Sequence, residues 1–109
     1  MSATILPGAL VIYVPNHAHG WLGHKDCERG FVTAISIGRQ CAWCRFWSKY
    51  DPAELRTRAN SERCDYDNLV VVGKMAPVRM RAMEAEYGFK FYEDGDSLEA
   101  VASETEREV

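Results

Sequence analysis

The sequence predicts a small, mainly β fold (α+β overall): a five-stranded antiparallel barrel in residues 1–74 and an acidic helical tail in residues 75–109. Three observations predict it. Five short runs rich in β-branched or aromatic residues lie between residues 9 and 73, separated by turn-forming residues. So many short strands favour closure into a barrel, which removes exposed sheet edges. After Gly73 the pattern becomes helical and acidic.

Each strand is predicted from its composition and from the residues that end it. Pro15 ends the first run because proline cannot donate a hydrogen bond to a central ladder. Gly38 begins the short connection of a hairpin between the second and third runs. Residues 49–61 are polar, with Pro52 at a turn or at the start of one helical turn. The predicted strands are residues 9–14 (ALVIYV), 31–37 (FVTAISI), 41–48 (CAWCRFWS), 62–66 (ERCDY) and 69–73 (LVVVG).

The tail is predicted to contain two helices. Pro77 suits the first position of a helix and Gly88 its C-terminal end. Val78, Met83 and Tyr87 are the residues of this helix expected to face the barrel. Residues 96–99 (DSLE) resemble a capping box that opens a second helix.

Charge is distributed unevenly along the chain. Residues 1–83 carry 11 basic and 7 acidic side chains, whereas residues 84–109 carry 2 basic and 9 acidic ones. This asymmetry predicts a mildly cationic body with an anionic tail. The tail is either a solvated helix that keeps the protein soluble or a charged contact surface.

Composition indicates one domain and a reducing compartment. A chain of 109 residues with 47% hydrophobic residues can bury one modest core. There is no long apolar run and no charged N-terminus followed by an apolar segment, so we expect neither membrane insertion nor secretion. We therefore predict a cytoplasmic protein, whose four cysteines are thiols or metal ligands rather than disulfides.

The ligand-rich stretch of the sequence is residues 17–30 (HAHGWLGHKDCERG). Its imidazole and thiol groups are ligands that zinc prefers, and Cys64 would complete a set of four. His19 competes for either imidazole position. Two other interpretations remain: histidines that only hydrogen-bond within a structural loop, or a catalytic Cys27 with a histidine base. The candidate metal ligands are His17, His24, Cys27 and Cys64.

The Cys41-Ala-Trp-Cys44 spacing is typical of redox pairs and zinc knuckles, but here it lies in a predicted strand. Side chains three apart in a strand point to opposite faces, so the two sulfurs should not converge. Cys44 is expected inside, with Ala42 and Phe46. Cys41 is expected outside, on a face that is either a binding surface or covered by the C-terminal helix and that also carries Trp43, Arg45 and Trp47.

Several segments together resemble a family of small uncharacterised proteins frequent in bacteriophage and prophage genomes. They are residues 11–20 (VIYVPNHAHG), 24–30 (HKDCERG), 32–35 (VTAI), 43–46 (WCRF) and 64–69 (CDYDNL). The resemblance covers about residues 8–72 and implies a five-stranded SH3- or Tudor-like barrel, with no established activity. It places His17, His24 and Glu28 at the family's loop positions. The segment between Trp47 and Cys64 and the tail after Gly73 lie outside it.

The favoured function is a non-catalytic, phage-derived protein that inhibits a host complex by protein contact, such as an anti-CRISPR or other anti-defence protein in the host cytoplasm. The chain shows no nucleophile elbow, phosphate-binding loop, HExxH motif or paired carboxylates, so we do not expect an enzyme. The alternatives are a nucleic-acid-binding module and a zinc-stabilised structural adaptor. Predicted interface residues are Trp43, Arg45, Trp47, Arg56, Arg58, Glu93, Asp94 and Asp96, with Arg39 and Lys49 added for nucleic acid.

Overall fold

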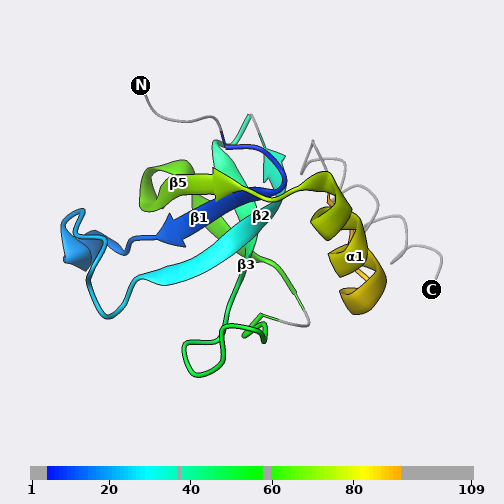
Figure 1. The fold of residues 1–109 in the computed structure, drawn as a ribbon. Coiled ribbons are helices and arrows are strands. Elements are labelled where there is room, and N and C mark those ends of the chain that lie inside the picture. Colours follow the sequence, from blue (N-terminus) through cyan, green and yellow to red (C-terminus); the bar gives the residue numbers. More distant parts are fainter. Residues whose placement is uncertain (1–4, 37, 58–59, 92–109) are drawn as a thin grey trace, which may run out of the picture.

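The computed structural model describes residues 5–36, 38–57 and 60–91. Within these residues five strands form one antiparallel sheet, followed by one α-helix (Figure 1). The strands are β1 (Ala9–Tyr13), β2 (Glu28–Ser36), β3 (Cys41–Phe46), β4 (Glu62–Asp65) and β5 (Leu69–Lys74), and the helix is α1 (Pro77–Tyr87). Two 3₁₀ turns, η1 (Asn16–Ala18) and η2 (Tyr66–Asn68), follow β1 and β4.

The strand order in the sheet is β4-β3-β2-β1-β5, with every neighbouring pair antiparallel. The predicted mainly β fold with five antiparallel strands and a C-terminal helix is therefore confirmed. In the described residues the sheet is open, since no ladder joins β4 to β5. This strand order is compatible with the predicted barrel, in which those two edge strands would lie next to each other.

The predicted strands agree with the observed ones except at some ends. β2 begins at Glu28, three residues before the predicted start, because Glu28, Arg29 and Gly30 pair with the end of β1. β3 stops at Phe46, and Trp47 forms an isolated bridge with Leu55. The predicted second helix at residues 96–99 lies outside the described residues.

One hydrophobic cluster fills the inner face of the sheet. Val11, Val32 and Phe46 are almost fully buried at its centre. Cys41, predicted to point outward, is also fully buried. The reason is that β3 is covered on both faces, so alternation along the strand no longer separates buried from exposed side chains.

A second cluster lies on the other face, under α1. Phe31 in β2 is its centre, and the helix contributes Met83. The partly buried residues packed against this cluster are Leu10, Trp47, Met80, Tyr87, Phe89 and Phe91. Of the three helix residues predicted to face the sheet, Met83 and Tyr87 do so, whereas Val78 is 78% exposed. Residues 75–91 are thus joined to the sheet by apolar packing.

None of the helices in the described part of the chain combines the length and apolar character that crossing a membrane requires.

A buried carboxylate connects α1 to the segment that follows it. The Glu84 carboxylate accepts hydrogen bonds from Arg81 Nη1 (2.7 Å) and from the Phe91 backbone N–H (3.1 Å). Gly88, at φ 80°, ends the helix between them in the left-handed conformation that glycine adopts without strain. The hydrogen bond from Arg81 lowers the pKa of Glu84 below its usual value, although burial raises it. The hydrogen bond from the Phe91 amide lowers this pKa further.

We expect Glu84→Gln to lower the free energy of unfolding by about 1–3 kcal/mol at pH 7, because the buried amide NH₂ would face an N–H donor in place of accepting from it. A carboxyl whose pKa is lower in the folded state stabilises the fold above its unfolded pKa, about 4.3, and loses this effect as pH falls through the folded value. The difference from wild type should therefore shrink below about pH 4. Urea unfolding at pH 7 and pH 3 measures this, with the exposed Glu86→Gln on the same helix as control. Equal effects of the two substitutions at pH 7 would contradict it.

Candidate functional site

Residues 15–27, the loop between β1 and β2, are built from consecutive tight turns. The amides of Ala18, Trp21, His24 and Cys27 each donate to the carbonyl three residues earlier, at 2.9–3.2 Å. The chain of hydrogen bonds therefore runs without a gap from Pro15 to Cys27. The N–H groups of these four turns are therefore satisfied within the loop, without a hydrogen bond to another molecule. Figure 1 shows it projecting from the sheet at the end away from α1.

Contacts at the base of the loop hold it to the rest of the fold. The Asn68 side chain in η2 donates to the Val14 carbonyl (2.9 Å) and to Asn16 Oδ1 (2.8 Å). Lys49 Nζ donates to the Lys25 carbonyl (2.6 Å). Ile12, Val14 and Ala18 form a small buried cluster beneath it, with Cys27 packed against them.

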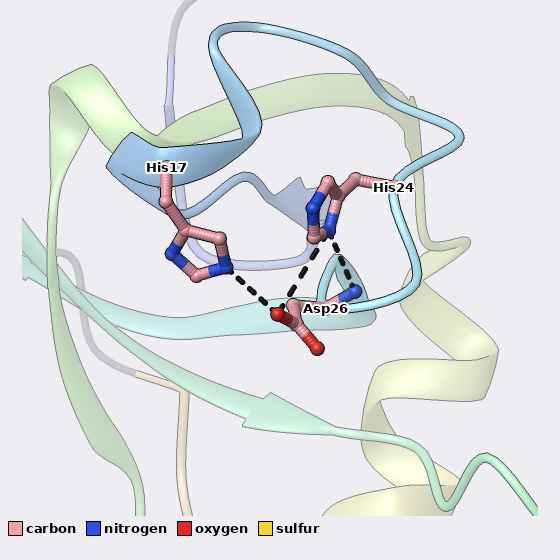
Figure 2. A group of neighbouring side chains, drawn as sticks. All are labelled: His17, His24 and Asp26. Atoms are coloured by element: carbon pink, nitrogen blue, oxygen red, sulfur yellow. Dashed lines mark hydrogen bonds and ion pairs between the residues drawn. The ribbon is translucent and has the colours of Figure 1, made fainter.

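Three side chains of this loop converge on one point (Figure 2). His17 Nε2 lies 2.7 Å and His24 Nδ1 3.9 Å from Asp26 Oδ2. The Asp26 backbone N–H also donates to His24 Nδ1 (3.0 Å), and the two imidazole rings meet edge to face at 5.1 Å. The hydrogen bond with His17 lowers the pKa of the Asp26 carboxyl. The cluster thus combines two imidazoles and an ionised carboxylate.

The structure brings together only two of the four predicted metal ligands. His17 and His24 are neighbours, but the Cys27 thiol donates to the Trp21 carbonyl (3.3 Å). Cys64 lies in β4 within the main core, paired with Ala42 in the ladder. A hydrogen bond with Cys64, together with burial, raises the pKa of the Cys44 thiol, as expected for buried, protonated sulfur. The structure therefore brings His17 and His24 together without either sulfur, and Asp26 is the third ligand-type side chain beside them.

The face of β3 that was predicted to be either a binding surface or covered is covered at Arg45 and Trp47. Arg45 is only 6% exposed: its guanidinium lies over the Phe89 ring, 4.4 Å from the centroid, and Nη1 donates to the Thr57 carbonyl (2.9 Å). This burial lowers the pKa of Arg45. Trp47 packs on Phe31, with ring centroids 5.5 Å apart. Arg45 is therefore buried, whereas Trp43 and Trp47 are both half-buried.

Arg56 is engaged by two carboxylates. Its Nε lies 2.8 Å from Glu28 in β2, and its Nη1 lies 3.0 Å from Glu62 in β4. The hydrogen bond with Glu62 raises the pKa of Arg56. A cation already paired with two carboxylates is poorly suited to binding a phosphate backbone.

The other predicted interface residues lie outside the described residues. They are Arg58, Glu93, Asp94 and Asp96.

Two apolar side chains at the tip of the loop are exposed, Trp21 (65%) and Leu22 (44%). Sequence reasoning missed both of them, as it missed Asp26. The available signal was a tryptophan–leucine pair enclosed by glycines, HGWLG, in a stretch without strand or helix periodicity. A large aromatic ring that no strand or helix carries into a core is a candidate for contact with another molecule.

Comparison with protein-family models, with curated proteins and with solved structures finds no match to this chain.

Proposed function

We propose that this chain is a non-catalytic binding protein that contacts a partner protein through the loop at residues 15–27, with Trp21 as the central contact. The observation that carries the proposal is the exposure of Trp21 and Leu22 on a loop whose turns are closed by its own hydrogen bonds. Tryptophan is enriched among the residues that dominate binding energy at protein interfaces. An ordered loop also loses little conformational entropy on binding.

The Trp21 ring is held by its neighbours as well as exposed. A side chain added at Gly23 would lie 2.9 Å from Trp21 Nε1, so the indole rests against the bare backbone of that glycine. The ring also meets His24 edge to face, with centroids 6.0 Å apart. These contacts restrict the orientation of the ring before any partner arrives, and the remainder of its surface stays available.

The resemblance of residues 8–72 to phage proteins supports the class of partner. Under this proposal the partner is a host complex, and the protein is an inhibitor of the anti-CRISPR or other anti-defence type that acts by occupying a surface. Nucleic-acid binding is less well supported, because three of the groups it would use already have partners within the fold. Arg45 is buried against Phe89, Trp47 packs on Phe31, and Arg56 is paired with two carboxylates.

We expect Trp21→Ala to weaken binding to the partner by at least about 30-fold, the loss typical of a residue that dominates an interface. The partner would be captured from bacterial lysate with wild-type protein, identified by mass spectrometry, purified, and its affinity measured for both variants. The thermal midpoint should stay within a degree or two of wild type because the side chain is largely exposed.

Tyr50→Ala is the matched control, since Tyr50 is a fully exposed aromatic residue on a different loop. It should leave the affinity unchanged within about twofold. Equal binding by wild type and Trp21→Ala would contradict the proposal, and so would a captured partner that is lost on nuclease treatment.

A further inference from the structure

The three convergent side chains of the loop at residues 15–27 suit a metal ion. We infer that His17, His24 and Asp26 bind one divalent transition-metal ion, zinc by ligand type, which joins η1 to the entry of β2. Imidazole nitrogen and carboxylate oxygen are both common zinc ligands, and three protein ligands with water in the fourth position form a recognised kind of site. This inference does not depend on the proposed function.

The distances are close to those that a zinc ion requires. Tetrahedral ligands at about 2.0–2.2 Å from zinc lie roughly 3.3–3.5 Å from one another. His17 Nε2 and Asp26 Oδ2, now 2.7 Å apart, must separate slightly, and His24 Nδ1, now 3.9 Å from the same oxygen, must approach. All three ligand atoms already lie within 4.8 Å of one another. Small side-chain rotations therefore suffice, and the backbone turns can stay as they are.

The hydrogen bonds of the cluster indicate which ring nitrogen of each histidine would bind the ion. His24 Nδ1 accepts the Asp26 backbone N–H, so this nitrogen carries no proton, and its lone pair would pass from that N–H to the ion. On His17 it is Nε2 that faces the carboxylate, and the ion would take the place of the proton between Nε2 and Oδ2. The Asp26 backbone N–H would give up His24 Nδ1 as its acceptor when the ion binds.

The local fold supplies the ordering that such a site needs. His17 lies in η1, whereas His24 and Asp26 lie just before β2, and the turns between them are closed by backbone hydrogen bonds. A site assembled before the metal arrives retains more of the metal's binding energy than one that must first be ordered. Since His17 and Asp26 are about half exposed, water can complete the coordination.

Titration of Zn²⁺ into the chelator-treated full chain, followed by calorimetry, tests the inference. We expect one ion per chain, and His17→Ala and Asp26→Asn should each weaken binding at least tenfold. His19→Ala is the matched control, because His19 is an exposed imidazole in the same loop that lies outside the cluster. It should bind as wild type does. Circular dichroism of each variant, compared with wild type, would show that the fold is retained.

Substitution with Co²⁺ provides a second readout that distinguishes the ligand types. The expected absorption spectrum has visible d–d bands and no thiolate charge-transfer band, and Cys27→Ser and Cys64→Ser should leave it unchanged. No stoichiometric binding to wild type, an equal loss in His19→Ala, or a thiolate band would overturn the inference. None of these measurements involves a partner protein, so their failure would leave the proposed role of Trp21 standing.

Discussion

Phe31→Ala should lower the free energy of unfolding by about 3–5 kcal/mol, the cost of removing a buried phenylalanine and leaving a cavity. Phe31 is fully buried and lies within 6.0 Å, between ring centroids, of Trp47, Phe89 and Phe91. It is the sheet residue on which the C-terminal segment rests. Because a domain of this size is stable by only about 5–15 kcal/mol, a large part of its stability should be lost. Urea unfolding followed by tryptophan fluorescence measures the change.

Two controls separate loss of the cluster from a general effect of substitution. Phe31→Leu keeps most of the apolar volume and should cost clearly less than Phe31→Ala. Val72→Ala, at a half-exposed position of β5, should stay within about 0.5 kcal/mol of wild type. If Phe31→Ala were no more destabilising than Val72→Ala, the packing of residues 75–91 on the sheet would be contradicted.

Gly30→Ala should destabilise the fold by about 1–3 kcal/mol or more, because the added methyl group has no space. A Cβ at this position would overlap the Arg45 carbonyl oxygen and lie 2.7 Å from Phe46 Cδ1. Gly30 pairs with Phe46 in the ladder between β2 and β3, so backbone atoms would have to move. The reason for glycine here is close approach of two strands rather than an unusual backbone conformation. Thermal and urea unfolding provide the measurement.

Gly38→Ala is the matched control in the connection between the same two strands. A Cβ there would meet nothing within 4 Å. Its effect should lie near zero or slightly on the stabilising side, since alanine restricts the unfolded chain more than glycine does. Similar destabilisation by both substitutions would show that loss of glycine flexibility, and not the space at Gly30, controls the outcome.

Much of the secondary structure could be predicted from the sequence because it depends on local patterns. Runs rich in β-branched residues between turn formers specified five strands, and helix α1 (Pro77–Tyr87) followed from its end signals, Pro77 and Gly88. The loop at residues 17–30 was also identified as the place where ligand side chains gather. Two of its histidines do come together, because they lie only seven residues apart on a tightly turned segment.

Tertiary packing decided which side chains remain available to bind another molecule or an ion. Arg45 and Trp47 alternate outward in a strand, but residues 75–91 return to cover that face, and no local pattern reports such a distant contact. Cys64 carries the ligand chemistry of zinc, yet its strand places it in the core. Asp26 became the third member of the His17–His24 cluster because the turns bring its carboxylate to both rings. The sequence alone therefore determined where strands, helix and loop lie, whereas long-range burial and turn geometry selected the groups left to bind.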